Sequence, residues 1–364
     1  RNTDDGCESV MAKFSFPQVR QRGLSLIELM IALLLGGILT VGLVQIFTSN
    51  SQSFRMVDAS ARAQESGRFA ADLAARAIRN AGFFGCFPVE GVTNNLDTSD
   101  PDYDPAFHNF QFQGITADSS LRPGAAVADT DFFITMGVRR AGASIASTAQ
   151  VNSASFTVDD SGDLASGDIV FLTDCIKGDI FELSDVQSGG GGATIKATKT
   201  QFANSGDGLA GNDFSVNAPP GCNTSPNCLS AVYGEGTDVF RTYSKAYFIG
   251  TGASGEPGLF MRDSTGASFE LVSGVVDMQL RFGEGDPSTG VQNWNVPASV
   301  SDWNSVMAVE VSLLVQGGGD RVMQSPSALC YPGWTDCSGG KNWTASDDRL
   351  YRVFNFTTAI RNQI

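Results

Sequence analysis

Two periodic patterns of apolar residues divide the chain. Residues 24–44 form a continuous apolar run that contains one charge, Glu28, and a helix of about 20 such residues spans the hydrocarbon of a bilayer. Residues 54–81 then place apolar side chains at three- and four-residue steps between charged ones, which indicates an amphipathic helix. The pattern predicts one helix over 24–81: a membrane-spanning part (24–53) and an amphipathic part (54–81). Three weak helix formers are expected to bend the first part: Gly36, Gly37 and Gly42.

Beyond residue 82 the apolar period changes to two, which is typical of half-buried strands. No long helical pattern separates these strands, so an antiparallel sheet with the N-terminal helix laid across it is expected. The predicted fold class is α+β, with a β-rich extracytoplasmic domain over 82–364. A composition shift at Gly189 to Gly192 suggests that this domain has two lobes. The predicted strands are 131–138, 155–158, 168–173, 193–199, 238–249, 258–262, 275–282, 306–315 and 351–360.

The segments between the strands are poor in apolar residues and rich in Gly, Asp, Ser and Asn. This composition predicts surface loops. They comprise 93–104, 188–192, 204–226, 283–295 and 325–348.

Charge narrows the range of partners. The 364 residues carry 24 Lys and Arg against 39 Asp and Glu, a net charge of −15. Affinity for nucleic acid depends on Lys and Arg that neutralise phosphates, so nucleic acid is not expected as a main partner.

Seven cysteines are present, and Cys7 alone precedes the apolar run. The other six contain no C-x-x-C pair, so their spacing does not support a zinc ribbon or a redox motif, and disulfides in an oxidising compartment are expected. Six cysteines allow 15 connectivities. Proximity along the chain favours two pairs, Cys222 with Cys228 and Cys330 with Cys337, which leaves Cys86 with Cys175.

The flanks of the apolar run predict its orientation. Lys13, Arg20 and Arg22 precede it, so the positive-inside rule places the N-terminus in the cytoplasm and the rest outside. A cleaved secretory signal does not fit, because its apolar core has 7 to 15 residues and the nearest A-x-A pattern here begins at Ala59. An ordinary anchor leaves Glu28 unexplained, because a carboxylate in lipid is costly.

The stretch "RGLSLIELMIALLLGGILTVGLV" (residues 22–44) resembles the N-terminal signature of type IV pilins and related pseudopilins. In that family a short basic leader ends in glycine, and glutamate is the fifth residue of the mature chain. The resemblance implies that a prepilin peptidase cuts between Gly23 and Leu24 and methylates the amine of Leu24. Leu24 departs from the family's commonest first residue, phenylalanine. Residues 1–23 would be the leader, with Met11 as a natural start.

Three further stretches resemble the globular domain of PilW-type minor pilins: "FLTDCIKGDIFEL" (171–183), "LVSGVVDMQLRFG" (271–283) and "DRLYRVFNFTTAIRNQ" (348–363). The resemblance implies a subunit that is held in the inner membrane and then built into an extracellular pilus, at or near the tip, where minor pilins prime assembly. The implied partners are prepilin peptidase, other minor pilins, the major pilin, the inner-membrane assembly platform and a large tip adhesin. Glu28 would pair with the free amine of a neighbouring subunit.

Two other functions remain open from the sequence. A minor pseudopilin of a type II secretion system has the same N-terminus. A membrane-anchored periplasmic binding or hydrolytic domain would use the helix only as a tether, and Glu28 would then have no role in assembly.

The sequence offers little for catalysis, and no enzyme activity or cofactor is expected. His108 is the single histidine, so we expect it to serve packing or to lie at the surface. "SGGK" at 338–341 has the S-x-x-K spacing of some serine acylases without their other motifs. Gly189 to Gly192 lacks the Lys-Ser/Thr of a phosphate loop.

Two acidic segments, 97–104 and 159–163, supply the oxygen ligands that Ca²⁺ favours. Neither fits the EF-hand loop, because Leu164 stands where its glycine is required, and solvated turns are the favoured interpretation. The weak calcium candidates are Asp100, Asp102, Asp104, Asp159 and Asp163, and no metal site is predicted. The adjacent bases Arg139 and Arg140 are expected at an exposed strand end.

Overall fold

A computed structural model describes residues 23, 25–85, 92–110, 114–147, 155–189, 192–196, 210–215 and 228–363. The chain forms two compact units, Arg1–Phe54 and Arg55–Ile364. The first contains the apolar part of the N-terminal helix, and the second contains all of the strands in the described part of the chain.

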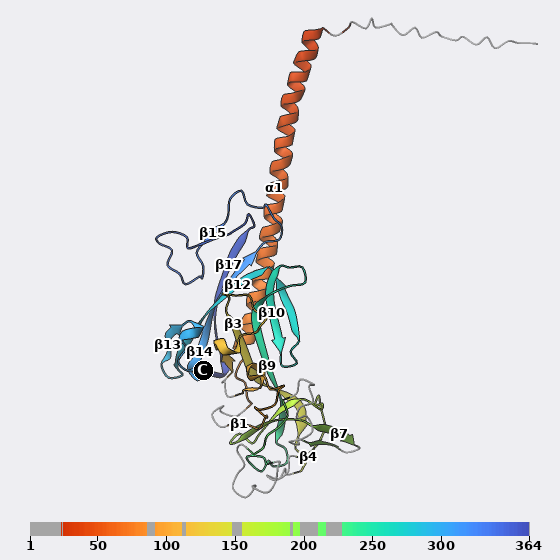
Figure 1. Ribbon diagram of the computed structural model, residues 1–364, viewed down its shortest axis with the longest axis vertical. Coiled ribbons are helices and arrows are strands. Elements are labelled where there is room, and N and C mark those ends of the chain that lie inside the picture. The colour runs from red at the N-terminus through yellow and green to blue at the C-terminus, as the bar shows by residue number, and fades with distance from the viewer. Residues whose placement is uncertain are drawn as a thin grey trace, which may run out of the picture. The chain divides into compact units, whose positions relative to one another are not determined.

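Helix α1 (Leu26–Arg79) has 54 residues and agrees with the predicted range of 24–81. The expected bend is absent, because helix continues through Gly36, Gly37 and Gly42 (Figure 1). Each of these glycines has open space where a Cβ would be, so close packing within this chain does not explain them.

The strands confirm the α+β class. Among the described residues, the largest sheet has eight strands, in the order β1-β6-β5-β9-β10-β11 with β2 and β3 joined through β9. They are β1 (Val92–Asn94), β2 (Ile115–Thr116), β3 (Phe132–Ser144), β5 (Ile169–Thr173), β6 (Gly178–Glu182), β9 (Asp238–Thr251), β10 (Pro257–Asp263) and β11 (Ser268–Ser273).

A four-stranded antiparallel sheet has the order β13-β12-β14-β17. Its strands are β12 (Val275–Asp286), β13 (Gly290–Asn295), β14 (Val306–Gln316) and β17 (Tyr351–Ala359). Two small sheets complete the described part: β4 (Ser155–Val158), β7 (Asp185–Gly189) and β8 (Gly192–Lys196), and the pair β15 (Ala328–Leu329) and β16 (Trp343–Thr344). Short helical turns are α2 (Pro105–His108), η1 (Ser119–Leu121), η2 (Pro297–Ser299), η3 (Trp303–Ser305) and η4 (Arg361–Gln363).

Every predicted strand is present, and only the strand over 155–158 has both ends as predicted. The expectation of loop over 283–295 is wrong, because these residues form the end of β12 and the hairpin strand β13. The expectation of a purely antiparallel sheet also needs correction, because β1 pairs with β6 in parallel. Gly189 and Gly192 pair with each other at the tip of the β7–β8 hairpin. Most of the predicted loop 204–226 lies outside the described residues.

Small residues let the amphipathic part of α1 approach the four-stranded sheet closely. At Gly67 an added Cβ would lie 2.2 Å from Cε2 of Phe354 on β17, closer than atoms can pack. Helix residues Ala63, Ala70 and Ala74 join one hydrophobic core with β12 and β14 side chains such as Leu280 and Val311. The buried positions of the helix recur at four- and three-residue steps: Ala59, Ala63, Gly67, Ala70, Ala74 and Ile78.

Asp131 links the eight-stranded sheet to the four-stranded sheet. Its backbone N–H donates to the Met278 carbonyl at 2.8 Å, and its Oδ2 accepts from the Leu280 N–H at 2.8 Å. The carboxylate thereby occupies an edge of β12 that β13, which pairs only with residues 282–286, leaves free. Burial raises the pKa of Asp131 to about 6, which the hydrogen bond from Leu280 only partly offsets.

We expect Ala63→Leu to destabilise the second unit, because Ala63 is fully buried against the sheet. Overpacking of this kind costs about 1–3 kcal/mol. Ala61→Leu is the matched control, because Ala61 is exposed two residues away on the same helix. Denaturant unfolding of the two variants measures the difference, and equal midpoints would contradict the packing described for this helix face.

The raised pKa of Asp131 makes stability depend on pH. The fold favours the protonated carboxyl, so its contribution is complete below the ordinary aspartate pKa and is lost as pH rises through about 6. In Asp131→Asn, the amide oxygen still accepts from Leu280. We expect this variant to unfold at the same denaturant concentration as the wild type near pH 4 and to be more stable near pH 7. A variant less stable than wild type at pH 7 would refute this expectation.

Candidate functional site

The start of helix α1 is built by local hydrogen bonds. The Ser25 carbonyl accepts from the Leu29 N–H at 3.2 Å, and Ser25 Oγ accepts from the Glu28 N–H at 3.3 Å. Ser25 therefore acts as the N-cap, with Glu28 at the third helical position. Serine at the cap and glutamate three residues later form the sequence pattern of a capping box. Glu28 also lies in the first turn, where the helix dipole favours negative charge.

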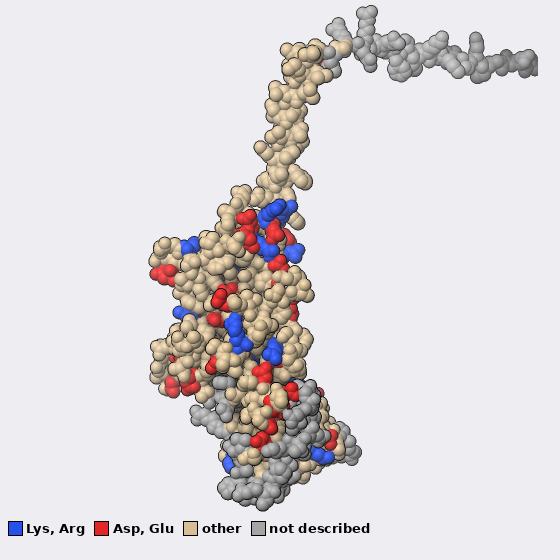
Figure 2. Space-filling model, in the orientation of Figure 1, with Lys and Arg blue, Asp and Glu red and all other residues tan. Residues whose placement is uncertain are grey.

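The following turns expose an unbroken apolar surface. The most apolar 18-residue window of α1 has no buried residue, and the helix is long and apolar enough to cross a membrane. Figure 2 shows this segment without a Lys, Arg, Asp or Glu over most of its length. Its large exposed side chains are Leu26, Ile27, Leu29, Met30, Ile31, Leu33, Leu34, Leu35, Ile38, Leu39, Val41, Leu43, Val44, Ile46 and Phe47.

Two hydroxyl groups of this segment are satisfied within the helix. Thr40 Oγ1 donates to the Gly36 carbonyl at 2.8 Å, and Thr48 Oγ1 donates to the Val44 and Gln45 carbonyls at 3.0 Å. Hydroxyls bonded to the preceding turn need no partner outside the helix. Glu28 differs from these threonines because it carries a charge, and it is the one charged residue in 24–44.

The structure places the predicted processing residues at the end of this segment. Gly23 is exposed and precedes the helix, and Glu28 is exposed in its first turn. Leu24 and the leader residues 1–22, Met11 and Cys7 among them, lie outside the described residues. The S-x-x-E spacing of a capping box is present in the sequence. The expectation for Glu28 used only the family resemblance and did not include its position three residues after the N-cap Ser25.

The cysteines divide into described and undescribed positions. Cys330 and Cys337 form a disulfide with a Cα–Cα distance of 6.1 Å, as predicted, and close a loop between β14 and β17. Cys175 and Cys228 are also disulfide-bonded. Cys86 and Cys222 lie outside the described residues, so the pairings of Cys86 with Cys175 and of Cys222 with Cys228 stay predictions.

The weak calcium candidates serve as caps, turns and ion pairs. Asp104 caps α2 by accepting from the Ala106 N–H at 2.9 Å, and Asp159 accepts from Ser144 N and Oγ at 2.7 and 2.8 Å. Asp100 accepts from the Asp102 N–H within its own turn. In the part of the chain that the structure describes, no three His, Cys, Asp or Glu side chains lie close enough together to hold a metal ion.

His108 is a packing residue. It is 3% exposed, and its Nδ1 accepts from the Asp104 N–H at 2.9 Å, which leaves the proton on Nε2. Burial lowers the pKa of His108, although Asp104 and Asp102 oppose this effect. Its role in the α2 turn agrees with the expectation from the sequence.

Comparison with known proteins gives two family matches. The prokaryotic N-terminal methylation motif matches residues 19–44, which include the exposed helix start. The family of type IV pilus-assembly protein W matches residues 246–362, from β9 to the C-terminus. No curated protein matches the chain.

One solved structure is similar in part. It is a type IV-like pilin from Thermus thermophilus, 19% identical over 34% of this chain and 68% of that chain, with a TM-score of 0.21. At this score the superposition carries no argument. The two family matches cover 22–44, 271–283 and all but the last residue of 348–363, three of the four stretches that resemble pilins in the sequence, whereas 171–183 lies outside both matches. In the two matched segments the chain therefore matches the type IV pilin family, and the C-terminal segment is of the PilW type.

Proposed function

We propose that this chain is a minor pilin of a type IV pilus that acts by assembly into the filament. The observation that carries the proposal is the methylation motif directly at the start of an apolar helix, in one chain with a PilW-type segment. Pilins are structural proteins, so no catalytic residue and no cofactor enter the mechanism.

Processing at the helix start is the first step of the proposed mechanism. Prepilin peptidase would cut after Gly23, which lies exposed ahead of the helix, and methylate the new amine of Leu24. Before assembly the apolar helix would hold the chain in the bacterial inner membrane. The basic residues ahead of it favour a cytoplasmic N-terminus and a periplasmic globular domain.

Glu28 would then direct the packing of helices. Removing the exposed apolar side chains from lipid into a bundle of similar helices leaves the Glu28 carboxylate in a dry environment. There an unpaired charge costs several kcal/mol, whereas pairing with the amine of a neighbouring subunit removes most of that cost. The pair thus selects the register in which subunits add.

The finer role we propose is priming. Together with other minor pilins, the chain would form a small complex on the inner-membrane assembly platform, receive the major pilin beneath it, and end at or near the pilus tip. A second unit of this size on one helix supports a tip position, because a wide subunit crowds a regular shaft. A large tip adhesin is the expected further partner.

The charge of Glu28 can be separated from its place in the cap. Glu28→Gln keeps a side chain that suits the capping box but removes the charge, so we expect the helix and the membrane level of the protein to be preserved and assembly to be lost. Ser25→Ala is the control: it removes the cap, at a cost of about 1 kcal/mol, and keeps the charge. The measurement is the amount of this chain in sheared surface filaments relative to the membrane fraction.

Assembly of Glu28→Gln at the wild-type level would exclude the ion pair. It would favour the alternative in which the helix is only a tether for a periplasmic binding or hydrolytic domain. Loss of assembly in Ser25→Ala to the same extent would indicate that the integrity of the helix start, and not the charge of Glu28, limits assembly.

A minor pseudopilin of a type II secretion system is the second candidate, because the methylation motif alone is shared by both machines. The match to the pilus-assembly protein W family over 246–362 favours the pilus. We expect deletion of the chain to abolish surface pili and twitching while secreted enzymes remain at normal levels. The reverse outcome, normal pili with loss of secretion, would assign the chain to the secretion machine.

A further inference from the structure

A polar band crosses one face of the eight-stranded sheet between two hydrophobic cores. In the pairing of β3 with β9, Thr135 lies opposite Lys245, Gly137 opposite Tyr243, and Arg139 opposite Arg241. Because side chains alternate along a strand, these six positions share one face. Two residues further on, Tyr247 stacks on Phe133 with ring centroids 4.9 Å apart.

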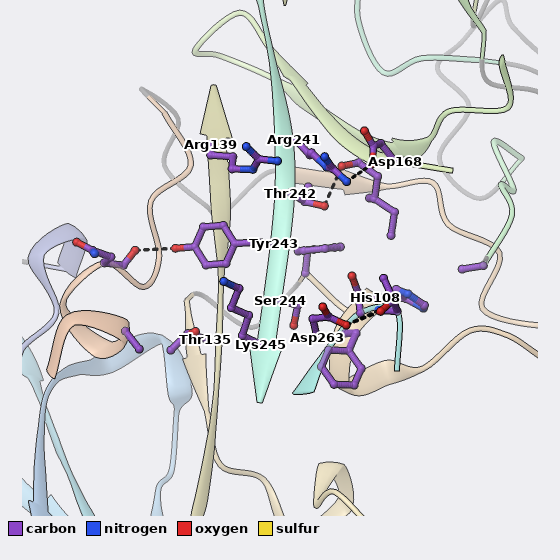
Figure 3. Close-up of a pocket in the computed structure, with 18 of the residues that line it drawn as sticks. His108, Thr135, Arg139, Asp168, Arg241, Thr242, Tyr243, Ser244, Lys245 and Asp263 are labelled. Atoms are coloured by element: carbon purple, nitrogen blue, oxygen red, sulfur yellow. Dashed lines mark hydrogen bonds and ion pairs between the residues drawn. The ribbon is translucent and has the colours of Figure 1, made fainter. Parts of the chain in front are cut away.

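Three cationic residues are therefore neighbours of one tyrosine on this face. Tyr243 has Arg241 and Lys245 on its own strand, and Arg139 is its diagonal neighbour on β3, within about 8 Å at the Cβ atoms. Figure 3 shows Tyr243 between Arg139 and Lys245 along the two strands. In a chain with a net charge of −15, this gathering of cations is unexpected.

Neighbouring acids do not fully neutralise these cations. Arg139 and Arg241 lie directly opposite each other, an arrangement that is unfavourable without anions. Arg241 pairs closely with Asp168, whereas Arg139 reaches Asp163 only at 3.8 Å, with both side chains more than half exposed. Such an exposed pair contributes little.

Lys245 is the least neutralised of the three. It is half-buried, and its cross-strand neighbour on β10 is Asp263. Even so, no carboxylate of the described residues lies within ion-pairing distance of Lys245. A half-buried ammonium group without a carboxylate partner is available to an anionic ligand.

Tyr243 is held as a flat platform among these cations. Its hydroxyl donates to the Asn80 carbonyl at 2.8 Å, and a Cβ at Gly137 would lie 2.6 Å from that hydroxyl oxygen. The absence of a side chain at Gly137 therefore lets the ring lie across β3. The hydrogen bond fixes the ring, and Tyr243 is one of the residues that line a cavity.

The cavity has room for a ligand. It has a volume of about 800 Å³, and its lining includes Arg139, Tyr243 and Lys245 together with Arg76 and Asn80 at the end of α1. Small-molecule sites commonly have about 300–1,000 Å³ and combine apolar walls with a few convergent polar groups. All of the lining residues belong to the second unit.

We propose that this cavity binds an acidic carbohydrate, a pyranose ring that carries a carboxylate. The ring's apolar face would pack on Tyr243, and the carboxylate would meet Lys245 and Arg139 through charge-assisted hydrogen bonds, which are stronger than neutral ones. The buried hydroxyl-bearing residue Thr135 lies opposite Lys245, at the same end of the band. This activity is separate from assembly and does not depend on the proposed pilus function.

An acidic sugar fits the band better than a simple anion does. Inorganic phosphate would use the cations but not the fixed aromatic face. A neutral sugar would use the aromatic face but leave Lys245 unpaired. A ligand with a flat apolar face and one charged edge uses both features.

The test is calorimetric titration of the full chain in a non-ionic detergent with trigalacturonic acid, its neutral methyl ester and inorganic phosphate. We expect the acid to bind, with an affinity that falls as salt is added, and the ester and phosphate to bind at least tenfold more weakly. Lys245→Met should weaken binding of the acid about tenfold or more. Arg139→Gln, at an exposed position that tolerates change, should weaken it in the same direction.

Lys341→Met is the matched control, because Lys341 is exposed and does not line the cavity. It should leave binding unchanged. The proposal is overturned by no detectable binding of the acid, by equal binding of the ester or phosphate, or by wild-type affinity in both Lys245→Met and Arg139→Gln. Equal weakening by Lys341→Met would also overturn it, because the effect would then come from overall charge.

Discussion

The free-energy cost of exposing the first half of α1 to water is the constraint on which the rest of the molecule depends. Fifteen large apolar side chains between Leu26 and Phe47 are more than half exposed, and each gains about 1.5–3 kcal/mol when it leaves water. No other described part of the chain covers them. This segment therefore requires lipid or the apolar helices of other subunits, and a chain that exchanges one for the other can enter a filament.

In the proposed filament, Glu28 would determine how that requirement is met. The Thr hydroxyls in the segment bond to their own helix, and the cap accepts from the Glu28 N–H at its start. The apolar surface alone would therefore accept helices in many registers. A single carboxylate in the first turn makes those registers unequal, because only one that brings a cation to it avoids an unpaired charge. In an isolated helix the same carboxylate interacts favourably with the helix dipole, which would stabilise the helix in the membrane before assembly.

The second unit is organised by close approach of backbones. Gly67 and the alanines of the same helix face permit contact with the four-stranded sheet, and Asp131 joins that sheet to the larger one through β12. The disulfide between Cys330 and Cys337 closes a loop in the connection from β14 to β17 of the four-stranded sheet. The polar band between the cores lines a cavity in which Arg139 and Lys245 gather in a chain of net negative charge.

Sequence patterns predicted the parts of the fold that depend on local periodicity. The helix and the half-buried strands follow from spacings of 3.6 and 2 residues, and all of the predicted strands are present. Strand β13 was missed because its sequence, GVQNWN, shows no buried alternate face, and all but its end residues are exposed. The polar band was also missed: Arg139, Tyr243 and Lys245 come together only through the register of β3 with β9, which are about 100 residues apart. The capping pattern at Ser25 to Glu28 was visible, but a pattern of four residues does not show which of its roles matters.

The N-terminal peptide of the membrane-extracted protein, identified by mass spectrometry in cells with and without prepilin peptidase, tests the central claim most directly. The account predicts a mature chain that begins with methylated Leu24 when the peptidase is present, and an uncut leader joined through Gly23 when it is absent. The same uncut N-terminus in both strains would contradict the account and leave Glu28 as an unexplained charge in a simple membrane anchor.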